Sequence, residues 1–79
     1  FVALRRLLRE TRVAAGVSQV ELAELVGETQ SEVSKIERGE RRLDLVQLRT
    51  ICGALGTTLP DLVAEWERRL GGRRPGRRR

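Results

Sequence analysis

Side chains that could act as nucleophiles, general bases or metal ligands are scarce in this sequence. The 79 residues contain one cysteine, Cys52, and no histidine. A nucleophile–base pair built on histidine, a metal site built on histidine or paired cysteines, and an intramolecular disulfide are therefore excluded. The carboxylates fall at predicted helix starts or on solvated helix faces. We expect no catalysis, no metal, no cofactor and no small-molecule ligand, and we expect Cys52 to be a buried thiol.

The charged residues are the remaining candidates for binding chemistry. The formal net charge is +5, which suggests a polyanionic partner. However, residues 71–79 contribute five arginines and no acid, so residues 1–70 carry eleven basic and eleven acidic side chains. Any binding of nucleic acid must therefore depend on where individual charges lie, because the body of the chain is neutral.

The elements that would position these side chains begin with two short helices. The same series of signals occurs over residues 18–27 and again over residues 29–39. Each series has a hydroxyl residue three positions before a glutamate, which is a capping box, then an apolar stripe and a terminal glycine. The sequence therefore predicts helices at 19–26 and 30–38 joined by a tight turn, which is a helix-turn-helix.

Three further helices are predicted to cover these two, which are too short to be stable alone. The first spans 2–15, and caps at Asp44 and Thr58 begin helices that run to residues 55 and 70. Apolar stripes along these helices extend from Leu45 and from Leu59 to their far ends. We expect an all-α, compact five-helix domain over residues 1–70, followed by a basic flexible tail over 71–79.

Some features of this arrangement allow more than one interpretation. Gly53 lies inside a predicted helix at a cost of about 1 kcal/mol relative to alanine, which a close helix approach would justify. Trp66 would pack against the first helix near Leu4 and Leu8, which we favour, or form a dimer contact. The tail would contact phosphates, link to a further domain or be an expression remnant. Because the chain does not begin with Met, we expect that Phe1 is not the natural start.

The segment from Val17 to Gly39 resembles the helix-turn-helix of the lambda repressor/Cro class, also called the XRE family. The residues that carry this resemblance are Ser18, Gln19, Leu22, Ala23, Val26, Gly27, Gln30, Val33, Ile36, Glu37 and Gly39. The five-helix layout extends the resemblance over residues 4–67. It implies a lambda repressor-like domain with the helix-turn-helix at its second and third helices.

The resemblance also implies how such a domain would meet DNA. The helix at 30–38 would enter the major groove, and the helix at 19–26 would cross the phosphate backbone. The base-contacting candidates are then Gln30, Ser31, Ser34 and Lys35. A glutamine can bond an adenine edge with two hydrogen bonds, and a lysine can reach a guanine or a phosphate. The phosphate-contacting candidates are Gln19, Arg38, Arg41 and Arg42, with Arg49 a weaker one.

Acidic residues near this face need their own explanation. Glu32 would lie close to phosphates, and we expect it to serve the helix cap, with a hydrogen bond from a cytosine amino group as the alternative. The acidic cluster that should face away from DNA is Glu21, Glu24 and Glu28. The resemblance further implies an ion pair between Arg12 and Glu37 that ties the recognition helix to the scaffold.

These observations predict sequence-specific binding of double-stranded DNA by a bacterial or phage transcriptional regulator, as a homodimer on a palindromic operator. The alternative is a protein-interaction module, such as an antitoxin or a co-regulator, because the body is neutral. An enzyme would require a catalytic domain outside this sequence. No stretch approaches the roughly 20 apolar residues of a membrane span, and no signal peptide is present, so we expect a cytoplasmic, nucleoid-associated protein.

Overall fold

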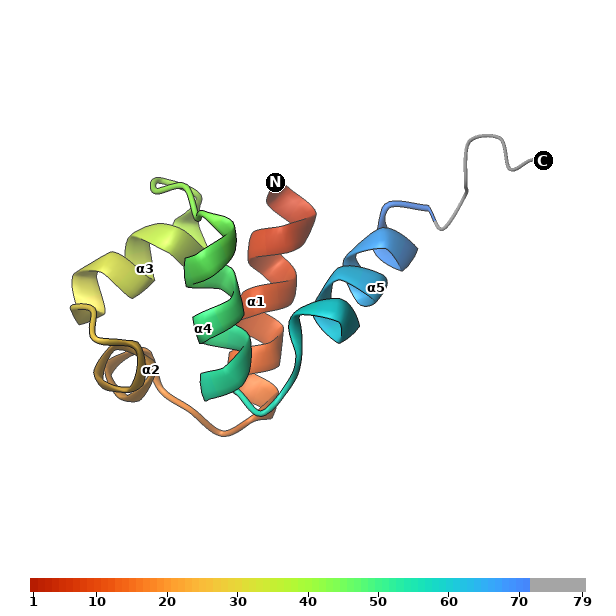
Figure 1. Ribbon diagram of the computed structural model, residues 1–79. Helices are drawn as coiled ribbons and strands as arrows, with labels where there is room; N and C mark the ends of the chain where they lie inside the picture. The colour runs from red at the N-terminus through yellow and green to blue at the C-terminus, as the bar shows by residue number, and fades with distance from the viewer. Residues whose placement is uncertain (72–79) are drawn as a thin grey trace.

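The computed structural model describes residues 1–71, and this part of the chain folds into five α-helices (Figure 1). In chain order these are α1 (Val2–Ala14), α2 (Gln19–Val26), α3 (Gln30–Arg38), α4 (Leu45–Ala54) and α5 (Leu59–Arg69). The all-α prediction is confirmed, and each boundary agrees with its prediction to within one residue. The predicted tail, apart from Gly71, lies outside the described residues, so the division at residue 70 stays a prediction.

Side-chain caps begin four of these helices, and they explain why the chain changes direction there. Ser18 accepts a hydrogen bond from the amide of Glu21 at 3.0 Å, and Asp44 accepts one from Gln47 at 2.7 Å. Both caps are complete boxes, because the third residue reaches back to the amide of the cap. Each cap satisfies amides that the first helical turn leaves without partners.

The capping box predicted at Thr29 is only half right. Thr29 Oγ1 accepts a hydrogen bond from the amide of Glu32 at 3.1 Å, but the structure has no return bond from Glu32 to Thr29. The carboxylate of Glu32 instead lies 3.7 Å from Nε of Arg41. Arg41, which follows α3 in the chain, therefore pairs with the carboxylate that was expected to complete the capping box.

Glycines with positive φ end α2 and α3. Gly27 has φ 74° and Gly39 has φ 80°, a left-handed conformation that costs a side chain with a Cβ about 1–2 kcal/mol. At Gly39 a Cβ would also lie only 2.8 Å from Nε of Arg5. The positive φ of Gly39 therefore favours glycine, and a Cβ there would also require the Arg5 side chain to shift.

The core is formed by the inner faces of all five helices. Figure 1 shows α2 and α3 on one side of α1 and α4, and α5 on the other side. The buried apolar residues are Leu4, Leu7, Leu8, Leu22, Ala23, Val33, Ile36, Leu48, Ile51, Cys52, Leu55 and Leu62. Trp66 packs against this core from α5, as we favoured. The thiol of Cys52 is buried as expected, and burial raises its pKa.

The apolar stripes are shorter than the sequence suggested. Leu45 at the start of α4 is 66% exposed, and Leu70 just after α5 is 58% exposed. Both lie at helix ends. Arg69 instead ties the last turn of α5 to α1, since its Nη2 lies 2.8 Å from Glu10 Oε1. The hydrogen bond from Arg69 lowers the pKa of the Glu10 carboxyl.

None of the helices within residues 1–71 is long and apolar enough to cross a membrane. The same residues hold no group of three or more acidic, cysteine or histidine side chains placed to bind a metal ion.

The expectation that Gly53 permits a close helix approach is wrong, because a Cβ built there meets nothing within 4 Å. We predict that Gly53→Ala stabilises the domain by about 0.5–1 kcal/mol, since alanine lowers the entropy of the unfolded chain. Urea denaturation measures this change. The matched control is Gly56→Ala, which also meets no neighbour but has φ 78° and should destabilise. Equal effects of the two substitutions would contradict the prediction.

Candidate nucleic-acid interface

A buried ion pair joins α1 to the last turn of α3. Arg12 Nε lies 2.6 Å from Glu37 Oε2, and Arg12 Nη2 lies 3.1 Å from Glu37 Oε1, so the contact is bidentate. The two side chains are only 10% and 6% exposed. Arg12 Nη1 also donates to the carbonyl oxygen of Val17 at 2.8 Å, in the loop before α2. One guanidinium therefore holds together α1, the start of the helix-turn-helix and α3.

Two glutamine amides extend this pair to the N-terminus of α3. Gln19 Nε2 donates to Glu37 Oε1 at 3.0 Å, and Gln19 Oε1 accepts from Gln30 Nε2 at 2.7 Å. The result is a continuous polar chain from Arg12 through Glu37 and Gln19 to Gln30. It spans three helices, and only its outer end, at Gln30, is exposed.

The predicted base-contacting residues lie along one side of α3. Gln30, Ser31 and Lys35 are exposed, and Ser34 is half-buried. The hydroxyl of Ser34 accepts a hydrogen bond from Nη1 of Arg38, one turn later. The structure therefore brings all four polar groups to this face, with Gln30 bonded to Gln19 of α2 and Ser34 bonded to Arg38 within the helix.

Arg38, predicted to contact phosphate, lies at the C-terminal end of the same face. Its Nε is 2.9 Å from Glu40 Oε2, and both side chains are more than half exposed. The hydrogen bond from Arg38 lowers the pKa of the Glu40 carboxyl. Because the pair is solvated, it contributes little to stability and leaves Arg38 able to exchange partners.

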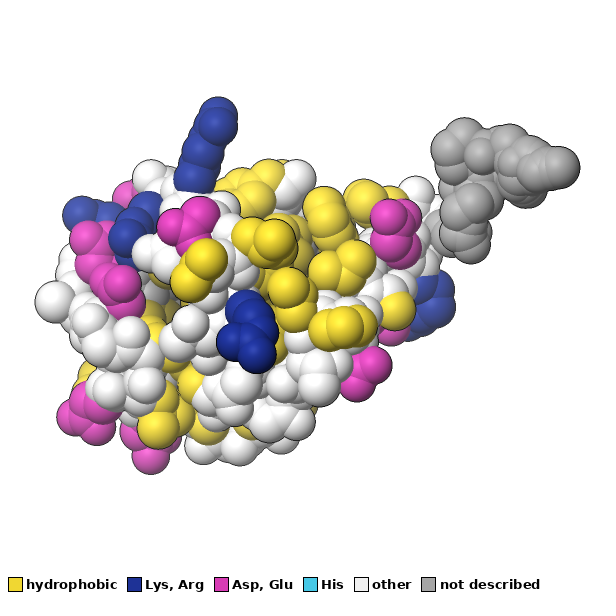
Figure 2. Space-filling view, viewed as in Figure 1, with side chains coloured by type: hydrophobic (Ala, Val, Ile, Leu, Met, Phe, Trp, Pro, Cys, Tyr) yellow, Lys and Arg dark blue, Asp and Glu magenta, His cyan; other side chains and the backbone are white. Residues whose placement is uncertain are grey.

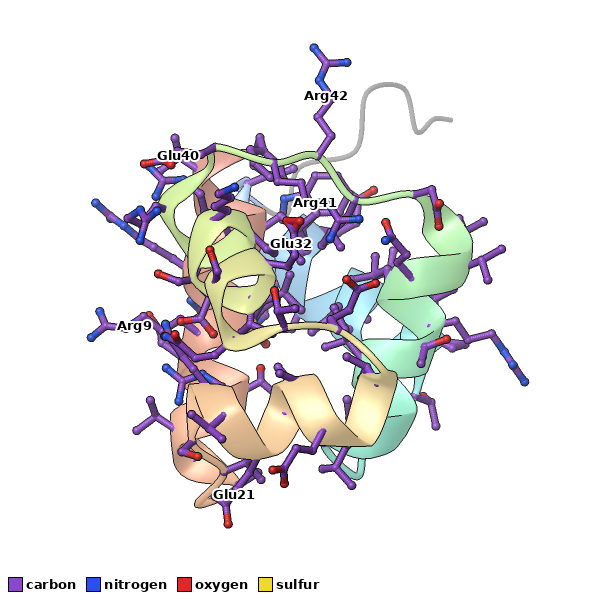
Figure 3. The ribbon with its side chains drawn as sticks, turned by 90° about the vertical axis from the view of Figure 1, so that its left-hand side faces the viewer. Arg9, Glu21, Glu32, Glu40, Arg41 and Arg42 are labelled. Carbon is purple, nitrogen blue, oxygen red and sulfur yellow. The ribbon has the colours of Figure 1, made fainter. Side chains whose placement is uncertain are left out.

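Arg41 and Arg42 differ although they are neighbours in sequence. Arg41 Nη1 lies 3.6 Å from Glu28 Oε1, and its Nε lies 3.7 Å from Glu32 Oε1, so two carboxylates already face this guanidinium. Figure 3 shows Arg42 projecting away from the body of the domain. Within residues 1–71 Arg42 forms no ion pair. Of the two, Arg42 is therefore the better placed to meet an outside anion.

Sequence reasoning missed the part that two α1 arginines have in this site. Arg5 Nη1 donates to the carbonyl oxygen of Glu37 at 3.2 Å, which satisfies a free carbonyl at the end of α3. Arg9 lies on the same flank of α3 (Figure 3). The signal was present in the sequence, because residues 5, 9 and 12 have the i, i+4, i+7 spacing of one helix face.

Comparison with known proteins agrees with this geometry. A helix-turn-helix family model (HTH_3) matches residues 8–62. An uncharacterized HTH-type transcriptional regulator from Methanothermobacter thermautotrophicus is 40% identical over 53 residues, which cover 67% of this chain and 77% of that protein.

Solved structures show the same fold. An XRE-family like protein from Pseudomonas syringae pv. tomato superposes with a TM-score of 0.81 and 44% identity, covering 86% of this chain and 83% of that one. The clp gene regulator ClgR from Corynebacterium glutamicum superposes with a TM-score of 0.80 and 32% identity, covering 87% of this chain and 73% of that one.

Two capped helices joined at a left-handed glycine, held on a five-helix core, define a helix-turn-helix DNA-binding domain of a transcriptional regulator. The chain belongs to the XRE/Cro/C1-type helix-turn-helix family. This family is non-enzymatic.

The buried pair generates a stability prediction. Arg12→Ala leaves the Glu37 carboxylate buried without its cation, and we expect a loss of about 3–5 kcal/mol. Arg9→Ala removes an exposed arginine of the same helix and should change stability by less than about 0.5 kcal/mol. Urea denaturation of both variants measures the difference.

The double substitution Arg12→Met with Glu37→Met shows whether Arg12→Ala loses stability because it leaves an unpaired buried charge or because it removes packing contacts. Because it leaves no unpaired ion, it should recover part of the stability that Arg12→Ala loses. If Arg12→Ala and Arg9→Ala gave equal losses, the pair would not hold the domain together.

Proposed function

We propose that α3 enters the major groove of double-stranded DNA and that Gln30, Ser31, Ser34 and Lys35 contact base edges there. The observation that carries this proposal is the polar chain that ends at Gln30, because it fixes one exposed amide at the start of α3. A glutamine fixed in this way can present its donor and acceptor together to an adenine. Binding to chromosomal or phage DNA would place the protein in the cytoplasm, with the nucleoid.

Phosphate contacts would set the register of the domain on the duplex. We assign them to Gln19 and Arg38, with Arg42 on the other side of α3. Arg41 would contribute only if phosphate competed with the carboxylates of Glu28 and Glu32, which lie 3.6 and 3.7 Å from its guanidinium. Such contacts are not sequence-specific, but they supply much of the affinity and its salt dependence.

We also infer that the domain binds as a homodimer to a palindromic operator, with half-sites about one helical turn apart. Exposed apolar residues support this inference, since Leu45, Val46 and Leu70 are 66%, 75% and 58% exposed. Figure 2 shows apolar side chains gathered over α4 and α5 on one face of the domain. A second copy of the chain would remove this apolar surface from water.

The same apolar face supports the second candidate, a protein-interaction module such as an antitoxin or a co-regulator. The two functions differ in their response to salt. A DNA complex with 6–10 phosphate contacts loses about 10³–10⁵ in affinity between 50 and 200 mM salt. An apolar protein contact does not weaken in this way.

Selection from a random pool of DNA duplexes tests the base contacts. We predict that the wild-type domain enriches a motif, and that Gln30→Ala and Lys35→Ala each relax the preference at one position per half-site. Each lost bidentate contact should reduce discrimination by about 1–3 kcal/mol, which sequencing of the enriched pools measures.

The matched control is Arg68→Ala on α5, which removes an exposed cation far along the chain from α3 and should leave the motif unchanged. A motif that neither α3 substitution alters would show that other residues read the bases. No enrichment at low salt with folded protein would leave the interaction module as the better proposal.

A further inference from the structure

An open pocket lies along the flank of α3 that faces α1. Its lining residues are Arg5, Arg9, Gln19, Glu37, Arg38 and Glu40. The pocket lies beside the proposed base-contacting face, because Gln19 is bonded to Gln30 and Arg38 is bonded to Ser34. Anything bound in this pocket would therefore lie next to the proposed base contacts of α3.

The charge balance of the pocket favours an anion. The Glu37 carboxylate is already bound by Arg12 and Gln19, and the Glu40 carboxylate is bound by Arg38. Arg5 is held in place by its bond to the Glu37 carbonyl oxygen. Arg9 is exposed and forms no ion pair with any residue from 1 to 71. The arginines thus outnumber the carboxylates, and one guanidinium has no partner among the described residues.

The position of the pocket indicates which anion it would meet. Figure 3 shows Arg9 and Arg41 on opposite sides of α3. A helix in the major groove has a phosphate strand on each side, since the groove is about 12 Å wide. The cations that follow α3 lie toward one strand, and the pocket lies toward the other.

We propose that this pocket binds a backbone phosphodiester of the DNA strand on the α1 side of the groove, with Arg9 as its main cation and Arg5 and Arg38 beside it. The proposal rests on the proposed DNA-binding function. It gives three of the four arginines of α1 separate tasks. Arg12 holds α3 in place, Arg5 covers its C-terminal end, and Arg9 fixes the depth and tilt of α3 in the groove.

The test compares Arg9→Gln with Arg6→Gln, an exposed arginine of the same helix that does not line the pocket. Affinity for the selected DNA is measured between 50 and 200 mM salt. Loss of one phosphate contact reduces the salt slope by about 0.9, so the affinity gap between wild type and Arg9→Gln should shrink about 3.5-fold across this range. The sequence preference of Arg9→Gln should stay unchanged, because phosphate contacts carry no base information.

A second measurement locates the contact. Duplexes that carry one uncharged methylphosphonate linkage at successive positions are titrated with wild type and with both variants. The wild type and Arg6→Gln should lose affinity when one particular linkage on the α1-side strand is neutralised. Arg9→Gln should lose clearly less affinity at that linkage, since the main partner cation is already gone and only Arg5 and Arg38 remain beside it.

The possible outcomes separate the two proposals. If the wild type binds DNA but Arg9→Gln keeps its salt slope and its linkage profile, the pocket does not hold a phosphate and the DNA-binding function stands. If Arg9→Gln and Arg6→Gln lower the slope equally, the effect is one of overall charge and the pocket proposal is overturned. If the wild type binds no DNA at 50 mM salt, the pocket proposal and the proposed function are both overturned.

Discussion

The structure depends on one buried ion pair, between Arg12 of α1 and Glu37 of α3. Among the nine residues of α3, only Val33 and Ile36 are buried apolar side chains, so apolar packing alone gives this helix little hold on the core. The bidentate pair adds a directional contact at its last turn, and the bond from Arg12 to the Val17 carbonyl oxygen fixes the entry to α2. A contact of this kind sets angles as well as distances. The position of α3 relative to α1 is thus set by a guanidinium together with Val33 and Ile36, which pack into the core.

Burial sorts Arg5, Arg9 and Arg12 of α1 into different tasks, although all three share one face. Arg12 is 8% exposed, Arg5 is half-buried and Arg9 is exposed. A guanidinium stays charged at any depth, so it must find acceptors in proportion to its burial. Arg12 has three acceptor oxygens, Arg5 has one and Arg9 has none among residues 1–71. A neutral body can therefore still present local positive charge, because most of its carboxylates are used inside the domain or face away from α3.

The sequence was sufficient to predict features that depend on neighbours in the chain. The caps at Ser18 and Asp44, the glycines after α2 and α3 and all five helices follow from signals within a few residues. The features that were predicted wrongly depend on residues that are farther apart in the sequence. Glu32 left its expected cap because Arg41 approaches from beyond α3, and Leu45, at the start of α4, is 66% exposed although it continues the apolar stripe. Likewise, the spacing of three arginines in α1 could not show that α3 would lie against their face.

The polar chain from Arg12 to Gln30 connects the buried ion pair to a proposed base contact. The Nε2 group of Gln30 has two hydrogens, and one is used by Gln19 Oε1 at 2.7 Å. The second hydrogen and Oε1 remain for a base edge, so the internal bond and a bidentate contact to adenine are compatible. The internal bond also restricts the rotamers of Gln30 before binding, and ordering a long polar side chain at an interface otherwise costs about 0.5–1.5 kcal/mol. In the proposed complex, therefore, the ion pair that holds α3 on the core also reduces the entropic cost of the base contact, because the Gln30 amide is the outer end of the same network.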